Sequence, residues 1–188
     1  MFRFGLFLAS VVFVVDQIAK YIILEVMHFS PEGCRGVGRF APDPMACGRV
    51  DVTSFFDLRM VWNTGVSFGW LRADAGIGRW ALVALSFAIS GVFVWWLRSA
   101  KRRLTATALG LVIGGALGNV IDRIRFGAVA DFLDFNGLWF PWVFNVADAA
   151  ITVGAALLLV DFLLHGEEKP ALATAAAGEA PKNGHDPG

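Results

Sequence analysis

The chain has 188 residues, of which 56% are hydrophobic and only 17% are charged, and its formal net charge is zero. A soluble domain of this length needs far more polar surface, so the composition favours an integral membrane protein. The two cysteines form no CxxC motif and the three histidines are scattered, which argues against zinc and haem sites. The basic residues form no patch that would indicate nucleic-acid binding.

Four apolar runs are long enough to cross the hydrocarbon core as helices, which takes about 20 residues each. They predict an all-α integral membrane fold with four transmembrane helices, at about 4–27, 78–97, 104–121 and 141–164. Asp16 and Lys20 interrupt the first run, and no small-residue cleavage site closely follows it. We therefore interpret this run as a membrane span and not as a cleaved signal peptide.

The charges between the runs predict the orientation in the membrane. Four basic residues lie within 98–103, between the second and third runs, and the positive-inside rule places this short loop in the cytoplasm. Both termini are then cytoplasmic, and the segments 28–77 and 122–140 face outward. We expect one transmembrane domain over 1–165, followed by a disordered cytoplasmic tail at 166–188 that is rich in Ala, Gly, Pro and charge.

The first outward-facing segment contains a candidate β element at about 50–70. This stretch is rich in β-branched and aromatic residues, with partial alternation around an Asn-Thr-Gly turn at 63–65. The stretch before it, 30–48, is rich in Gly and Pro and is expected to be irregular. It contains Cys34 and Cys47, and the sequence leaves open whether they form a local disulfide or remain free thiols.

Polar residues inside or beside the spans concentrate at one membrane depth. A charged side chain in the hydrocarbon costs at least about 2.5 kcal/mol, so each one needs a reason. With the predicted orientation, nearly all of them fall at the outer edge of the membrane. These residues are Asp16, Lys20, Asn63, Asn119, Asp122, Arg123, Asp131, Asp134, Asn145 and Asp148. The pattern predicts a polar site in that layer.

Some of these residues also have a purely structural interpretation. Asp16 and Lys20 are four residues apart, so they can neutralise each other on one helix face. Asn119 and Arg123 have the same spacing, and Arg123 can pair with Asp122 or with a lipid headgroup. For these residues the sequence alone favours a mainly structural role.

A stripe of small residues runs along the third apolar run. Gly110, Gly114 and Gly118 repeat every four residues, a pattern typical of closely packed membrane helices. Close packing at Gly118 would bring the adjacent Asn119 towards a neighbouring helix.

Asp148 is the carboxyl with the least local compensation. Its neighbours at helical spacing, Asn145 and Thr152, are neutral hydrogen-bonding groups, and burial penalises its charged form. A second carboxylate close by would leave the two sharing one proton. Such a pair can deprotonate a water and protonate a leaving group, which hydrolyses a peptide without a covalent intermediate. The residues by themselves do not decide between Asp131 and Asp122 as the partner.

Two other classes of protein use similar features. A small proton-coupled transporter would use buried carboxylates as relay sites, but such proteins commonly show internal repeats and broken helices, which this sequence lacks. A non-catalytic assembly or anchor protein would use the glycine stripe as an interface. Nucleophilic hydrolases are disfavoured because the chain has no GxSxG elbow, and zinc metalloproteases because it has no HExxH motif.

Five sequence blocks occur in a fixed order along the chain. They are DQIAK at 16–20, NTGVSF at 63–68, GGALGNVIDR at 114–123, VADF at 129–132 and FNVAD at 144–148. In this order they resemble the lipoprotein signal peptidase (signal peptidase II) family of bacteria, and the resemblance covers about residues 4–164. One block would be weak evidence, but five in order are highly specific.

The resemblance implies both a reaction and a set of site residues. Asp131 and Asp148 match the catalytic aspartates of the family. Ten further residues match positions that line or support its site: Asp16, Lys20, Asn63, Gly65, Gly115, Asn119, Asp122, Arg123, Asn145 and Ala147. The implied enzyme is an aspartic endopeptidase of the bacterial inner membrane, surrounded by membrane lipids, with no metal or organic cofactor. Its substrates are diacylglyceryl-modified prolipoproteins, cut just before the lipidated cysteine. A bundle of four helices can be stable as a monomer.

Overall fold

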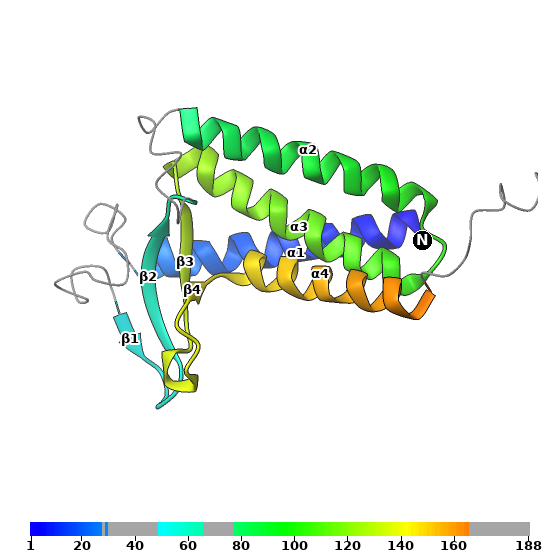
Figure 1. The fold of residues 1–188 in the computed structure, drawn as a ribbon. Coiled ribbons are helices and arrows are strands. Elements are labelled where there is room, and N and C mark those ends of the chain that lie inside the picture. Colours follow the sequence, from blue (N-terminus) through cyan, green and yellow to red (C-terminus); the bar gives the residue numbers. More distant parts are fainter. Residues whose placement is uncertain (28, 30–48, 66–76, 166–188) are drawn as a thin grey trace, which may run out of the picture.

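The computed structural model describes residues 1–27, 29, 49–65 and 77–165. The four predicted membrane helices are present and pack side by side, and a small sheet lies across one end of the bundle (Figure 1). The helices are α1 (Phe2–Tyr21, continued by a π-helical turn at Ile22–Val26), α2 (Ile77–Ser99), α3 (Arg103–Phe126) and α4 (Val146–His165). All four are long and apolar enough to cross a membrane. The predicted irregular stretch with its two cysteines and the predicted tail lie outside the described residues.

Two helix boundaries differ from the sequence prediction. α3 continues five residues further than predicted, to Phe126, and ends where Gly127 takes a φ of +82°. α4 begins at Val146 and not at Pro141. Its start is set by Asn145, whose side-chain oxygen accepts a 2.8 Å hydrogen bond from the backbone N–H of Asp148 and so caps the first turn.

The β element is larger than predicted and includes part of the second segment that the sequence predicts to face outward. One antiparallel sheet has the strand order β1-β2-β3-β4. Its strands are β1 (Arg49–Asp51), β2 (Asp57–Asn63), β3 (Val129–Asp134) and β4 (Val143–Phe144). Only β1 and β2 lie in the predicted region, because short strands from separate segments complete a sheet that local patterning does not reveal.

The turn predicted around Asn63-Thr64-Gly65 is present: β2 ends at Asn63, whose side-chain oxygen accepts a hydrogen bond from the backbone N–H of Gly65. Residues 66–70 of the predicted β element lie outside the described residues. A second turn, at 52–56, joins β1 to β2, and there the Thr53 side-chain oxygen accepts hydrogen bonds from the backbone N–H groups of Phe55 and Phe56. Asn63 pairs with Val129 of β3, which joins the two segments that the sequence predicts to face outward.

The glycine stripe is a helix-packing surface, as predicted. A Cβ atom at Gly110 would lie 2.6 Å from the carbonyl oxygen of Gly5, and one at Gly114 would collide with the carbonyl oxygen of Ala9. α1 and α3 therefore approach each other along backbone atoms, a distance that only glycine permits at these positions.

We expect the Gly114→Ala variant to be less stable than the wild type by about 1–3 kcal/mol, because the added methyl must push α1 away from α3. The matched control is Gly91→Ala on α2, where an added Cβ meets no atom within 4 Å. Thermal unfolding in detergent measures both. Equal melting temperatures for the two variants would contradict the packing assignment.

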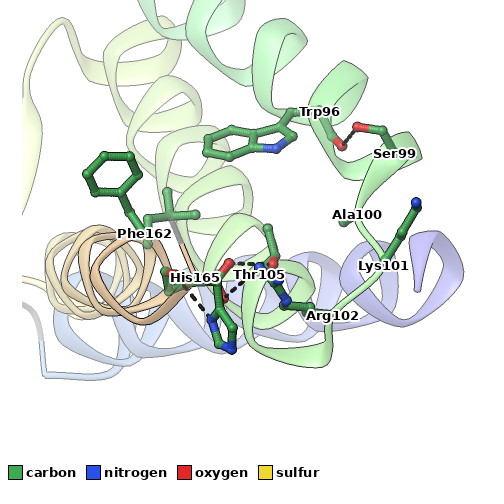
Figure 2. A pocket seen from close by; sticks show the side chains of 10 residues that line it. Trp96, Ser99, Ala100, Lys101, Arg102, Thr105, Phe162 and His165 are labelled. Atoms are coloured by element: carbon green, nitrogen blue, oxygen red, sulfur yellow. Dashed lines mark hydrogen bonds and ion pairs between the residues drawn. The ribbon is translucent and has the colours of Figure 1, made fainter. Parts of the chain in front are cut away.

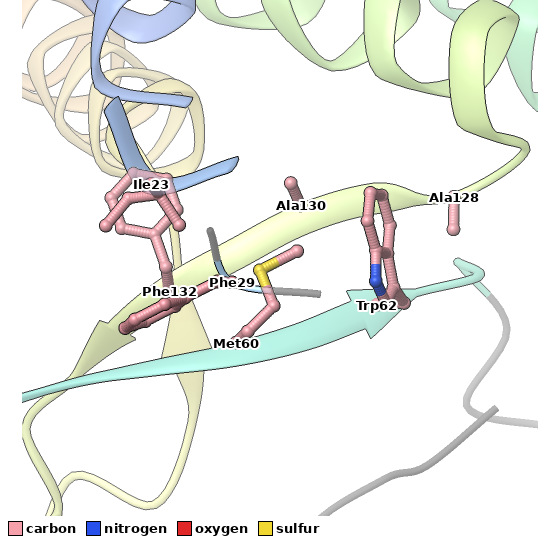
Figure 3. Close-up of a cluster of buried hydrophobic side chains, with 7 residues drawn as sticks. All are labelled: Ile23, Phe29, Met60, Trp62, Ala128, Ala130 and Phe132. Atoms are coloured by element: carbon pink, nitrogen blue, oxygen red, sulfur yellow. The ribbon is translucent and has the colours of Figure 1, made fainter. Parts of the chain in front are cut away.

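The two ends of the bundle differ in character. At the end opposite the sheet, a cavity of about 540 Å³ lies between the end of α2, the start of α3 and the end of α4 (Figure 2). At the sheet end, apolar side chains fill the space between the sheet and the end of α1 (Figure 3). These side chains are Ile23, Phe29, Met60, Trp62, Ala128, Ala130 and Phe132. This cluster fixes β2 and β3 against the helices and so holds the strand that carries Asp131.

Candidate active site

Asp131 is a buried carboxyl on the central strand β3. Asp131 is only 2% exposed. It pairs across the sheet with Val61 of β2. It accepts a 2.7 Å hydrogen bond from Asn145 Nδ2 and is also hydrogen-bonded by the side chain of Asn63. Burial, followed by the charge of Asp148, raises the pKa of Asp131 to about 8, against the effect of these hydrogen bonds. Its carboxyl is therefore mostly protonated at neutral pH.

Asp148 lies in a different environment. It is half-buried in the first turn of α4, where the partial positive charge of the helix N-terminus favours an anion. Its Oδ1 accepts a 2.7 Å hydrogen bond from Asn119 Nδ2. The sequence indicated Asp148 as the carboxyl with the least local compensation, and the structure buries Asp131 more deeply than Asp148, because β3 is paired on both sides, with β2 and β4.

Two asparagine side chains connect these carboxyls. Asn145 Nδ2 donates to Asp131, and also contacts Asn119 Oδ1 at 3.2 Å and the carbonyl oxygen of Ala130 at 3.3 Å. Asn119 Nδ2 in turn donates to Asp148. Both asparagines are buried, at 0% and 6% exposure. Asp131 and Asp148 therefore face one continuous hydrogen-bonded group, although they come from a strand and a helix.

A buried ionic cluster supports this group from the bundle side. Lys20 Nζ lies 2.8 Å from Asp16 Oδ2 and 2.7 Å from Asp122 Oδ2, and all three side chains are at most 4% exposed. Lys20 also donates to Asn119 Oδ1 at 3.2 Å, which orients the amide so that its nitrogen points to Asp148. The predicted neutralisation of Asp16 by Lys20 is confirmed, but Lys20 pairs with a second carboxylate as well.

The role of Asp122 differs from that of Asp131. Asp122 Oδ2 pairs with Lys20 and accepts a 3.2 Å hydrogen bond from the backbone N–H of Ala130. The sequence suggested Arg123 as a partner of Asp122, whereas the structure gives this position to Lys20. Because Asp122 forms a direct ion pair with Lys20, whereas Asp131 is connected to Asp148 through Asn145 and Asn119, the geometry favours Asp131 as the partner of Asp148.

Two small residues allow the helices to meet around the site. A Cβ at Gly115 would collide with the carbonyl oxygen of Ala147, and one at Gly118 would lie 2.5 Å from Asp16 Oδ2. Ala147 is fully buried, and its backbone N–H donates a 2.9 Å hydrogen bond to Asp16 Oδ1. Asp16 thus joins α1 to the start of α4, and α3 contacts both.

The remaining predicted site residues lie at the edge of the group. Asn63 ends β2, and its Oδ1 accepts a 2.8 Å hydrogen bond from the backbone N–H of Gly65, which has a φ of +83°. A Cβ at Gly65 would lie 3.5 Å from Arg123 Nη2. The Arg123 guanidinium also interacts electrostatically with Asp148 and Asp131. It is therefore a cation beside the carboxyl pair.

All twelve predicted residues are thus brought to the sheet end of the bundle. Sequence reasoning missed two contributors. Gln17 Nε2 donates to Asp16 Oδ2 at 3.2 Å and contacts the Gly118 carbonyl at 3.4 Å; its place inside the DQIAK block was a usable signal. Ala130 contributes only backbone groups, to Asp122 and Asn145, and no side-chain pattern reveals those. Among the described residues, no group of three or more His, Cys, Asp or Glu could hold a metal ion.

The chain has four helices long and apolar enough to span a membrane, and an acidic site lies at one end of the bundle. These two features define the class: a multi-pass membrane protein similar to intramembrane aspartic peptidases. Residues 8–164 match the family described as signal peptidase (SPase) II, Peptidase_A8. The chain belongs to this family of bacterial aspartic peptidases.

Relatives and solved structures agree with this family. The chain is 43% identical to the lipoprotein signal peptidase of Caulobacter vibrioides, over 86% of this chain and 88% of that protein. It is 40% identical to that of Methylobacterium radiotolerans, over 96% and 98% of the two chains. A solved bacterial membrane enzyme matches with a TM-score of 0.68 at 25% identity, over 89% of this chain and 92% of that one. The predicted fold and family are confirmed.

Proposed function

We propose that the protein removes signal peptides from prolipoproteins whose lipobox cysteine carries diacylglycerol, cutting just before that cysteine. The observation that carries this proposal is the pairing of Asp131 and Asp148 through Asn145 and Asn119. The names of the relatives support the substrate class. Membrane helices beside the site suit a substrate that is itself held in the bilayer by a lipid and an apolar peptide.

The two carboxyls have environments suited to opposite roles. Asp131 serves as the acid, because burial disfavours its charge, and Asp148 serves as the base, from the first turn of α4. Asp148 removes a proton from a water, which attacks the scissile carbonyl carbon, while Asp131 gives its proton to the carbonyl oxygen. Asp148 then gives the proton from the water to the amine as the C–N bond breaks. The former carbonyl oxygen returns its proton to Asp131 at the same step, and no covalent intermediate forms.

The proposed site lies at the outer edge of a bacterial inner membrane. The sheet and the carboxyl pair lie at one end of the bundle, and the N-terminus lies at the other (Figure 1). The basic residues Lys101, Arg102 and Arg103 are near the end with the N-terminus, so the positive-inside rule supports cytoplasmic termini. We also propose a monomer, because a bundle of four helices can be stable without a second copy.

We expect cleavage to slow as the pH rises through about 8, the pKa of Asp131. Above this value the proton that Asp131 must donate is lost, so kcat/KM falls about ten-fold for each further pH unit. Initial rates measured between pH 5 and 10 in detergent check this. Circular dichroism at each pH separates titration from unfolding. A rate that stays constant to pH 10 in folded protein would rule out Asp131 as the acid.

The direct test is cleavage of a purified diacylglyceryl-modified precursor by the full chain in detergent. The same precursor without its lipid distinguishes a lipoprotein signal peptidase from a general membrane protease, because only the lipid-modified form should be cut. A transporter would instead move protons or solute across liposomes without any proteolysis.

A further inference from the structure

The cavity at the end of the bundle opposite the sheet lies about a helix length away from the carboxyl pair, and the proposed reaction does not use it. Its volume is about 540 Å³, and it is bounded by the last turns of α2 and α4 and by the α2–α3 connection. Three of the four candidate spans begin or end there, at Ser99, Arg103 and His165. The cavity therefore lies where the hydrocarbon meets the headgroup layer.

One wall of the cavity is apolar. Trp96, Leu158 and Phe162 contribute to it, and Trp96 and Phe162 lie on one side of the space in Figure 2. Both are exposed, at 41% and 67%, although they belong to different helices. An acyl chain can pack against such a surface, and a free inorganic ion cannot use it.

The opposite wall is polar and carries net positive charge. Lys101 and Arg102 contribute two positive charges and Asp161 one negative charge, which leaves +1 with His165 neutral. Lys101 is exposed and makes no ion pair among the described residues. Lysine in this position attracts phosphate groups of anionic lipids.

Asp161 is the buried acceptor at the base of this wall. It is 8% exposed, and its Oδ2 accepts a 2.6 Å hydrogen bond from Thr105. Its Oδ1 lies 3.2 Å from His165 Nδ1 and 3.9 Å from Arg102 Nη1, yet it accepts no hydrogen bond from the described residues. Oδ1 is thus held beside Arg102 and His165 and is itself buried, so Asp161 offsets part of the positive charge of this wall and is closed to a ligand.

The geometry points to a binding site for an anionic phospholipid, of which phosphatidylglycerol is the example tested. The phosphate contacts Lys101 and Arg102, and an acyl chain follows Trp96 and Phe162. Phosphatidylcholine fits less well, because its net charge is zero. The bound lipid connects α2 to α4 and stabilises that end of the bundle, since it binds only the folded state.

The test uses delipidated full-length protein in a neutral detergent. Phosphatidylglycerol, phosphatidylcholine and inorganic phosphate are added in turn, and bound lipid is counted by native mass spectrometry while thermal unfolding is followed. We expect phosphatidylglycerol alone to bind and to raise the melting temperature. The Lys101→Gln, Arg102→Gln double variant should bind it more weakly, by about five-fold for each charge removed.

The matched control is Arg98→Gln, Arg103→Gln, which removes the same charge from the same region but from residues that do not line the cavity. It should bind phosphatidylglycerol like the wild type. The single variant Lys101→Gln should fold normally, because Lys101 forms no ion pair among the described residues. Its affinity for phosphatidylglycerol should still fall about five-fold. Three results would each overturn the assignment. Phosphatidylcholine could bind as well as phosphatidylglycerol, or inorganic phosphate could raise the melting temperature as much. The control variant could also lose as much affinity for phosphatidylglycerol as the Lys101→Gln, Arg102→Gln variant.

Discussion

The Asp131→Asn and Asp148→Asn variants should each lose cleavage of a lipid-modified precursor, by a factor of about 10²–10⁴ or more. Asparagine keeps the shape of each side chain but can neither give nor take the proton. Asp131 is already mostly neutral at pH 7, because burial raises its pKa to about 8, so its replacement should leave the fold intact. Initial rates with equal amounts of folded enzyme measure the effect.

The chain offers a matched control on the same strand. Asp134 is also buried on β3, at 4% exposure, but it lies 3.6 Å from Arg59 and caps the next turn through the Asn136 N–H. The Asp134→Asn variant should keep most of the wild-type rate. If Asp131→Asn were as active as Asp134→Asn, the carboxyl pair would not be the catalytic group. The circular dichroism spectrum of Asp131→Asn would show whether an inactive variant is unfolded.

The Lys20→Met variant should lose about 3–5 kcal/mol of stability, because it leaves Asp16 and Asp122 buried without their cation. For a chain of this length that corresponds to a melting temperature lower by roughly 6–20 °C. Cleavage should also slow in whatever protein remains folded, because Asn119 loses the donor that orients it towards Asp148. Thermal unfolding in detergent and initial rates measure the two effects.

Two further variants test the reason for that loss. Lys101→Met removes a lysine that is exposed and unpaired among the described residues, and its melting temperature without added lipid should stay within a degree or two of the wild type. Adding Asp16→Asn and Asp122→Asn to Lys20→Met removes the two uncompensated charges and should recover much of the lost stability. A triple variant no more stable than Lys20→Met would show that packing of the lysine, and not charge balance, causes the effect.

The helices were predictable because lipid imposes a strong rule on sequence. A span must be apolar over about 20 residues, and all four runs obey it. The boundaries at the sheet end were less predictable. α3 includes Asp122 and Arg123 in its last turns, and α4 begins only after its capping residue, Asn145. Polar residues at these positions are typical of loops. The sequence did not show that they belong to helices, because their burial depends on partners from other helices.

The sheet shows the same limit for strands. β2 was visible as an alternating segment, but β3 and β4 are stabilised by pairing with strands distant in sequence. Phe132 and Ala130 on β3 pack into the cluster that also contains Ile23, in the π-helical turn that follows α1. Such contacts exist only once the helices are assembled, so a window of local sequence does not contain them.

The sequence alone predicted four candidate membrane spans, polar residues gathered at one end of them, and the family that its motifs match. It could not choose between Asp122 and Asp131 as the partner of Asp148 on physical grounds. Tertiary structure separates them, because Lys20 from α1 neutralises Asp122, whereas the amides of Asn145 and Asn119 connect Asp131 to Asp148. Charge compensation between helices is a property of their packing, and the distance between two residues in the sequence does not reveal it.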